Sequence, residues 1–326
     1  MTALKKNPND IKSIMILRPE GSMGDCVLSS FIFREIKNKY PHIKICAATF
    51  GVAYEYYKRN KYIDYLYKLP IKSKIRSSQR WLELIWAGLV IRTKGIDIII
   101  DSSDKSSPNW LLFKYLSSKK NGLLDKDHFV SNLYNRDDLH GVEQEQQILE
   151  TIGIKGLDTT YDIYSTPEAE NKLSDFLKKN NIDEYICLNC HASTEPRSFN
   201  SNTVHIIDKN MPDNKKIIIP CMPRHINSIK SYIPEGSKHS YYIYETNDIF
   251  ELISLIKSSK LLITPDTAAV HIGCGLHKPT IVFYITTHPH HAPRNDLAKV
   301  IISDSSNVNI FNEEDYIAAL KYLLEK

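Results

Sequence analysis

Short apolar runs alternate with amphipathic segments along the whole chain. In the first half this pattern predicts strands at 14–17, 44–48 and 96–100, and helices at 25–39, 81–91 and 142–152. Strands that alternate with helices are typical of βαβ units built around a parallel sheet. The first half therefore predicts a doubly wound, Rossmann-like α/β domain.

The second half repeats this order of elements, with strands predicted at 185–188, 217–219, 261–263 and 280–283 and a helix at 266–276. Between the halves lie Gly156, Pro167 and a polar helical pattern. We therefore expect two domains, 1–155 and 183–326, joined by a linker at 156–182. Ligands of doubly wound sheets bind beyond the carboxyl ends of the strands. Two such domains facing each other would enclose a ligand cleft.

The net charge limits the classes of molecule that the protein is expected to bind. A formal net charge of +4 and a pI near 8.5 suit a sugar nucleotide or an acidic membrane surface, and are too mild for nucleic-acid binding. No apolar run approaches the roughly 20 residues that span a bilayer. Residues 1–10 are polar and lack the apolar core of a signal peptide, so we expect a cytosolic protein.

The six cysteines fall mostly within strand and helix patterns, which favours buried, reduced thiols over a disulfide framework. The segment 187–191 spells the C-x-x-C-H pattern of haem attachment. It lies in and just after a predicted strand, where alternation would turn its two cysteines to opposite faces. We therefore expect no haem and no other cofactor.

The first candidate site joins the first strand to the first helix. Gly21 and Gly24 permit a tight turn at the carboxyl edge of the sheet, and Asp25 follows them. A dinucleotide fingerprint would need a third glycine, and a carboxylate there would repel phosphate. Two interpretations of Asp25 remain: a helix N-cap, or a general base that accepts a proton from a hydroxyl group.

Two further candidates lie in the second half. Residues 264–271 follow a strand and open a helix, where the amides of Thr267 and Ala268 and the side chains of Asp266 and Thr267 could bind an anion. A capped helix containing a core histidine, His271, is the alternative. The second candidate is a hydroxyl-rich loop with a cation, made of Ser193, Thr194 and Arg197, and its alternative is a solvated surface loop.

The run 15–28, MILRPEGSMGDCVL, is similar to the opening of glycosyltransferase family 9, the ADP-heptose:lipopolysaccharide heptosyltransferases. Tyr40-Pro41 and 140–142 also resemble that family. So does 266–271, which matches its D-T-G-x-x-H motif with Ala268 in place of the glycine, followed by Lys278-Pro279. The loop with Arg197 resembles the family loop that contacts the donor diphosphate, although lysine is commoner there.

The resemblance implies a GT-B fold with an N-terminal acceptor domain and a C-terminal donor domain. It implies that Asp25 is the base of a metal-independent, inverting transfer of heptose from ADP-heptose to a lipopolysaccharide or lipooligosaccharide core. Donor contacts would come from Ser193, Thr194, Arg197, Asp266, Thr267, Ala268 and His271. Weaker candidates for contacts to a lipid-linked saccharide acceptor are Ser22, Met23, Gly24 and His140.

Alternatives remain for the activity. The family usually has G-P-T-D-P where this chain has YITTHP at 284–289, so a UDP- or GDP-hexose donor is a second hypothesis. A non-catalytic sugar-nucleotide-binding protein is a third, and such a protein would not need Asp25. Asp125-Lys126-Asp127 and the histidines at 288, 290 and 291 could bind a metal, but neither group has a convincing set of ligands.

Residues 68–94 contain seven basic side chains and one acidic one beside an apolar stripe that carries two tryptophans. Packing on the sheet is one interpretation of this helix. The other is contact of the 72–94 region with an anionic membrane, which would place the enzyme peripherally on the cytoplasmic face of the inner membrane.

Overall fold

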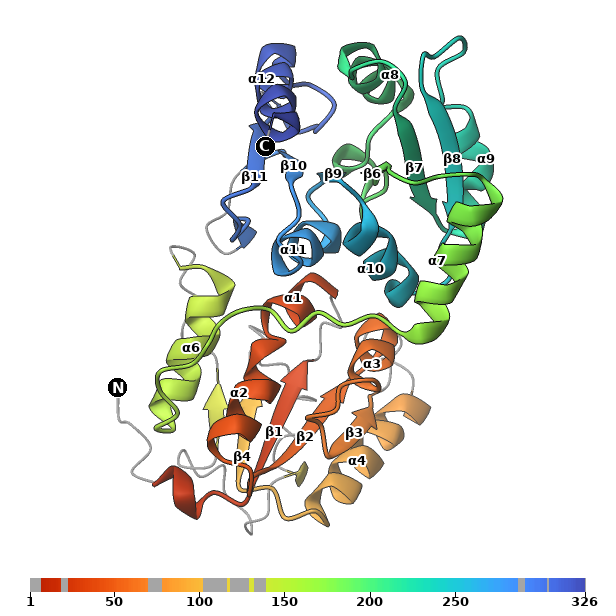
Figure 1. Cartoon of the computed structure of the whole chain (residues 1–326). Coiled ribbons are helices and arrows are strands. Elements are labelled where there is room, and N and C mark those ends of the chain that lie inside the picture. Colours follow the sequence, from red (N-terminus) through yellow and green to blue (C-terminus); the bar gives the residue numbers. More distant parts are fainter. Residues whose placement is uncertain are drawn as a thin grey trace. The chain divides into compact units, whose positions relative to one another are not determined.

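The computed structural model describes residues 7–18, 23–69, 78–101, 116–117, 129–131, 139–286, 291–303 and 305–325. The chain divides into two compact units, Met1–Asp162 and Ile163–Lys326. Each unit is a parallel β-sheet with helices around it (Figure 1).

The sheet of the first unit has the order β3-β2-β1-β4-β5, and all four strand pairs are parallel. Its strands are β1 (Ser13–Arg18), β2 (Lys44–Thr49), β3 (Tyr65–Lys68), β4 (Ile98–Asp101) and β5 (Phe129–Ser131). Its α-helices are α1 (Met23–Leu28), α2 (Phe31–Lys39), α3 (Gly51–Tyr57), α4 (Ser78–Arg92) and α6 (Gly141–Thr151). The central strand β1 is buried along its whole length, because it has a neighbouring strand on each side and apolar side chains pointing to both faces.

The single helix expected at 25–39 is two helices, α1 and α2, with a break at Ser29 and Ser30. Their hydroxyl groups donate to main-chain oxygens one turn earlier, Ser29 to Asp25 (2.7 Å) and Ser30 to Val27 (2.7 Å). Serine side chains that bond back in this way compete with the regular helical ladder. The apolar pattern continues across the break, so it gave no signal for it.

The second unit has a six-stranded parallel sheet in the order β11-β10-β9-β6-β7-β8. Its strands are β6 (Ile186–Leu188), β7 (Lys216–Cys221), β8 (Ser240–Glu245), β9 (Leu261–Pro265), β10 (Thr280–Tyr284) and β11 (Ala298–Ile302). Its α-helices are α7 (Pro167–Lys179), α8 (Ser201–Asn210), α9 (Ile226–Lys230), α10 (Ile249–Ser258), α11 (Ala268–Gly275) and α12 (Glu313–Leu324).

Each sheet reverses its strand order beside the first strand of its unit. In the first unit the reversal lies between β1 and β4, and in the second between β6 and β9. This is the Rossmann-like arrangement, and ligands of such sheets bind at the carboxyl ends of the strands that flank the reversal. The structure thus confirms the predicted α/β class with two doubly wound domains.

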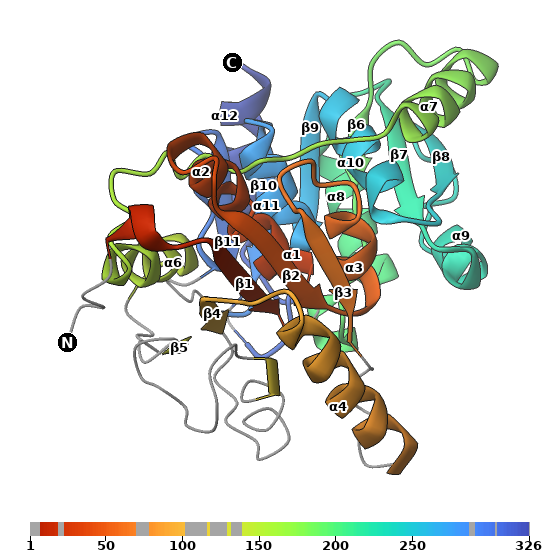
Figure 2. The same cartoon turned by 90° about the horizontal axis from the view of Figure 1, so that it is seen from below.

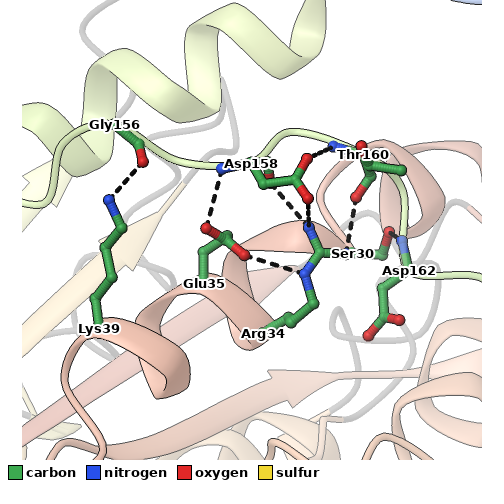
Figure 3. Close-up of polar contacts among 8 residues, drawn as sticks. All are labelled: Ser30, Arg34, Glu35, Lys39, Gly156, Asp158, Thr160 and Asp162. Atoms are coloured by element: carbon green, nitrogen blue, oxygen red, sulfur yellow. Dashed lines mark hydrogen bonds and ion pairs between the residues drawn. The ribbon is translucent and has the colours of Figure 1, made fainter.

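The segment 155–162 is attached to the first unit along α2 (Figure 3). Arg34 donates to the main-chain oxygens of Asp158 (2.9 Å) and Thr160 (3.0 Å), and the Glu35 carboxylate accepts from the amide of Asp158 (2.9 Å). The amide of Asp162 donates to the Ser30 hydroxyl (2.7 Å). We expected a linker at 156–182, and in the structure its first residues belong to the first unit.

The rest of that stretch belongs to the second unit. Helix α7 packs against α10, and the Ser165 hydroxyl donates to the main-chain oxygen of Phe250 in α10. The Pro167 that we assigned to a linker is the first residue of α7, where a missing N–H costs nothing.

All six cysteines are free and buried, as the sequence predicts. Among the described residues, the helices are all too short or too polar to cross a bilayer.

Candidate functional site

In the first unit, Asp25 lies just past the carboxyl end of the central strand. Helix α1 begins at Met23, so Asp25 is in its first turn and is not the N-cap that one interpretation assigned to it. Its side chain is half-buried, and a carboxylate in a first turn is stabilised by the positive end of the helix. Met23 and Gly24 precede it and are partly exposed, whereas Ser22 lies outside the described residues. Asp25 therefore remains a candidate base at the expected edge of the sheet.

A buried ion pair lies at the end of the same strand. Arg18, the last residue of β1, donates to the Glu145 carboxylate of α6 at 2.6 Å, and both side chains are nearly inaccessible to solvent. Burial alone would lower the pKa of Arg18, but the adjacent carboxylate raises it, so the guanidinium stays charged. Burial also raises the pKa of the neighbouring Cys26 thiol to about 12, which makes that group a poor nucleophile.

His140, a weaker candidate for acceptor binding, caps helix α6. Its Nδ1 accepts the amide of Val142 (3.1 Å), and Glu143 accepts the amide of His140 (3.2 Å), which completes a capping box. The residue is buried, with 9% of its surface exposed. Helix capping accounts for this histidine without any ligand.

In the second unit, two of the predicted motifs meet. Arg197 ends a short 3-10 helix in the loop after β6, and Asp266 directly follows β9. Nη2 of Arg197 donates to Oδ2 of Asp266 (2.8 Å) and to the main-chain oxygen of the same residue. Because β6 and β9 flank the reversal of strand order, this contact lies where a doubly wound sheet binds its ligand.

Asn189 connects the same two loops, and it was not among the residues predicted from the sequence. Its side-chain Nδ2 donates to the hydroxyls of Thr264 (2.9 Å) and Thr267 (3.2 Å). Its main-chain N–H donates to the main-chain oxygen of Ile263 (2.9 Å). The side chain is buried, with 8% of the residue exposed. Its position one residue after a predicted strand was the signal that could have identified it.

Helix α11 begins at Ala268, two residues after the predicted start at Asp266, and Thr267 is its N-cap. The Thr267 hydroxyl accepts the amide of Ala269 (3.2 Å). The cap thus uses neither of the two amides expected to bind an anion, those of Thr267 and Ala268. Gly273 brings this helix close to the sheet, since a Cβ there would lie 2.9 Å from side-chain atoms of Leu262 and Thr280.

The other predicted donor contacts differ in their exposure. Ser193 and Thr194 are exposed in the loop after β6. His271 is 3% exposed within α11, and its ring centroid lies 6.0 Å from that of His291. The hydroxyls are accessible to a ligand, whereas His271 is mostly enclosed by protein. Asp125, Asp127, His288 and His290 lie outside the described residues.

A histidine pair at this edge was missed by the sequence analysis. His191 follows β6 and His225 follows the adjacent strand β7, and their ring centroids are 4.5 Å apart. Arg224 donates to Nε2 of His225 (3.0 Å). Burial, followed by the nearby His225 and Arg224, lowers the pKa of His191. The folded protein therefore disfavours protonation of His191.

Comparison with known proteins identifies the family of the chain. The model of the family described as "Glycosyltransferase family 9 (heptosyltransferase)" matches residues 88–320. A protein of Escherichia coli (strain K12), named as a candidate lipopolysaccharide heptosyltransferase, is 25% identical to this chain. The alignment covers 97% of this chain and 88% of the relative.

Solved structures share the fold of the whole chain. A glycosyltransferase family 9 protein from Veillonella parvula matches with a TM-score of 0.80 at 17% identity, covering 98% of this chain and 99% of the other. The ADP-heptose lipopolysaccharide heptosyltransferase II of E. coli matches with a TM-score of 0.71 at 12% identity, covering 96% and 98%. These neighbours have the GT-B fold, and the family model spans more than half of the sequence. The chain belongs to glycosyltransferase family 9.

Proposed function

We propose that this protein is an inverting, metal-independent heptosyltransferase that transfers heptose from ADP-heptose to a lipopolysaccharide-type core acceptor. The family and the named relative support this class of reaction. The observation that carries the donor site is the contact between Arg197 and Asp266, which joins two family-like motifs at the reversal of the second sheet.

In the proposed mechanism, the first unit binds the acceptor and Asp25 accepts the proton of the attacking hydroxyl. The hydroxyl oxygen bonds to the anomeric carbon as the bond from that carbon to the diphosphate oxygen breaks. Attack from the face opposite the diphosphate inverts the anomeric configuration. Proton transfer to a positioned carboxylate contributes about 100- to 10,000-fold to such reactions.

In the second unit, negative charge that develops on the departing diphosphate would be stabilised by Arg197. The hydroxyls of Ser193 and Thr194 and the amides at the start of α11 would donate further hydrogen bonds. Preoriented donors of this kind are effective because they need no rearrangement when the charge appears. The Asp266 ion pair holds Arg197 in place before the donor arrives.

A panel of sugar nucleotides tests the choice of donor. Purified protein is incubated with ADP-heptose, UDP-hexoses or GDP-hexoses and with a core saccharide acceptor, and the product is followed by mass spectrometry. We expect transfer from ADP-heptose. Transfer from a UDP- or GDP-hexose alone would replace the donor in this proposal. Binding of a sugar nucleotide without any transfer would support a non-catalytic binding protein.

Replacement of Asp25 by asparagine tests the base. Asparagine keeps the size of the side chain but cannot accept the proton, so turnover should fall by about 100-fold or more while donor affinity stays nearly unchanged. Steady-state kinetics and calorimetry with the donor measure the two effects. Asp10→Asn, at an exposed aspartate of the same unit, is the matched control. Near-wild-type turnover in Asp25→Asn would refute the assignment.

A core saccharide of this kind is attached to a lipid, so the acceptor would lie at a membrane. We therefore also propose that the enzyme works peripherally on the cytoplasmic face of the inner membrane.

A further inference from the structure

Helix α4 of the first unit has apolar side chains on two opposite faces. With 3.6 residues per turn, Leu84, Ala87 and Ile91 fall on one face, and Leu82, Trp86 and Leu89 fall on the other. The first face packs on the sheet, in a cluster with β1 and β2 residues such as Met15 and Cys46. The sheet therefore accounts for only half of the apolar surface of this helix.

The second face is open to solvent. Trp86 is 69% exposed, Leu82 is 60% exposed and Leu89 is 42% exposed. Together with Ile85 and the exposed Glu83 they line a shallow groove along the helix. Each large apolar side chain left in water forgoes about 1.5–3 kcal/mol of burial free energy. A contiguous exposed apolar patch of this kind commonly marks a binding surface.

The charge around this face is positive. Among the described residues, Lys94 follows α4 and is exposed, and α4 lies on the side of the sheet opposite α3 (Figure 2). The ammonium group of Lys94 lies over the ring of Tyr65 (4.7 Å), whereas that of Lys68 lies over Tyr54 of α3 and so belongs to the other side of the sheet. In the sequence, four more basic residues precede the exposed face, and the only acidic residue between 68 and 94 is Glu83.

A second protein is a poor match for this surface. A stable protein interface buries about 800 Å² on each partner. One aromatic side chain buries about 150–250 Å² when it is fully covered. A single tryptophan with three aliphatic side chains on one helix, all of them partly covered already, supplies much less than 800 Å².

We propose that the exposed face of α4 docks on the interface of an anionic phospholipid bilayer. Trp86, Leu82 and Leu89 would enter the boundary between headgroups and acyl chains, and Lys94 would contact anionic headgroups. Tryptophan and leucine on one face with basic residues beside them are the features of helices that lie in this interface. This proposal does not depend on which sugar is transferred, and its test needs no enzymatic activity.

Vesicle binding tests the proposal with the full chain. The protein is floated with vesicles of phosphatidylcholine alone or mixed with phosphatidylglycerol, at low and high salt. We expect binding to the anionic vesicles, weakened by salt, since exposed charges are screened. Leu82→Gln/Trp86→Gln should lower the partition constant by about 10- to 100-fold. Lys94→Gln should lower it by about 5-fold, whereas Lys68→Gln, on the other side of the sheet, should leave it nearly unchanged.

Ile310→Gln is the matched control, because Ile310 is 54% exposed in the second unit and should not affect binding. A variant that keeps Trp86 as its single tryptophan gives a direct readout. Its emission should shift to the blue and be quenched by brominated acyl chains. Unchanged vesicle binding in Leu82→Gln/Trp86→Gln, or no quenching of Trp86, would overturn the proposal. A dimer in solution that Leu82→Gln/Trp86→Gln abolishes would instead assign this face to a second copy of the chain.

Discussion

Arg197 combines an internal ion pair with the capacity to bind an anion. A guanidinium carries donors on three nitrogens, and Arg197 uses Nη2 for both of its hydrogen bonds to Asp266. Nη1 and Nε can therefore reach a phosphate while Nη2 stays on Asp266. The arginine is 37% exposed in its side chain, so its remaining donors are accessible to a ligand.

Arg197→Ala should weaken binding of the nucleoside diphosphate by about 1.5–3 kcal/mol, the scale of a charge-assisted hydrogen bond. The variant also leaves the Asp266 carboxylate without its partner, which adds repulsion toward the phosphates. Calorimetry with the nucleoside diphosphate measures the change. Lys238→Ala, at an exposed lysine of the same unit, should leave affinity unchanged. Equal affinity in wild type and Arg197→Ala would remove Arg197 from the donor site.

The His191 and His225 pair predicts how stability depends on pH. The pKa of His191 is lowered in the folded protein, chiefly by burial, so protonation favours the unfolded chain. The contribution of His191 to the unfolding free energy is fully present above the ordinary histidine pKa of about 6.5. It is lost as the pH falls through the lowered pKa of His191 in the folded protein. The unfolding free energy should therefore decrease on acidification.

Urea unfolding at about pH 7.5 and about pH 5.5 measures this effect, since these values bracket the ordinary histidine pKa. His191→Phe keeps an aromatic ring against His225 and removes the titrating group, so it should lose less stability between the two pH values than the wild type. His205→Gln, at an exposed histidine on α8, is the control and should behave like the wild type. An identical pH dependence in His191→Phe would contradict the assignment.

At the scale of elements, the Arg18–Glu145 pair joins the end of β1 to helix α6. Glu145→Gln preserves the shape of the side chain but leaves the Arg18 charge buried without its carboxylate. Removing one partner of a buried pair costs about 3–5 kcal/mol of unfolding free energy. Lys44→Gln breaks an ion pair with Asp64 in which the lysine is 60% exposed, and should cost about 1 kcal/mol or less. Similar costs for the two variants, measured by urea unfolding, would contradict this account.

The elements predicted from the sequence are those with an uninterrupted apolar core. Strands β1, β7 and β9 are buried along most or all of their length, and their apolar runs were sufficient to find them. Strands β3 and β8 were missed, because tyrosines, lysine and glutamate on partly exposed strands dilute the apolar signal. The break between α1 and α2 depends on hydrogen bonds of two serine hydroxyls. The pattern of apolar positions carries no information about such bonds, so it could not predict the break.

The candidate site was predictable only as separate motifs. Asp25 and Thr267 follow strands, and the family resemblance drew attention to both. The contact of Arg197 with Asp266 joins residues 69 positions apart, and no local pattern specifies such a pair. His191 and His225 meet for the same reason, because β6 and β7 are neighbours in the sheet.

At the scale of the whole molecule, the two units follow the same plan with different chemistry. Each unit has a functional candidate after its first strand, at the reversal of strand order. In the first unit this candidate is a carboxylate, Asp25, which suits proton transfer. In the second it is the cation Arg197 near the start of α11, which suits a diphosphate. This division supports the proposed assignment of the acceptor to the first unit and of the donor to the second.

The donor half also determines what we expect of divalent metals. If Arg197 and the amides at the start of α11 stabilise the leaving diphosphate, sugar transfer should persist in EDTA and gain little from Mg²⁺ or Mn²⁺. The Asp266 carboxylate is the feature that argues the other way, because carboxylate oxygens bind Mg²⁺ in many phosphate sites and this one lies beside the predicted diphosphate. Measuring transfer after thorough chelation, and again after each metal is restored, separates the two cases. Activity that is lost in EDTA and returns only with a divalent ion would show that a metal stabilises the leaving group, and loss of that metal response in Asp266→Asn would then identify Asp266 as a ligand.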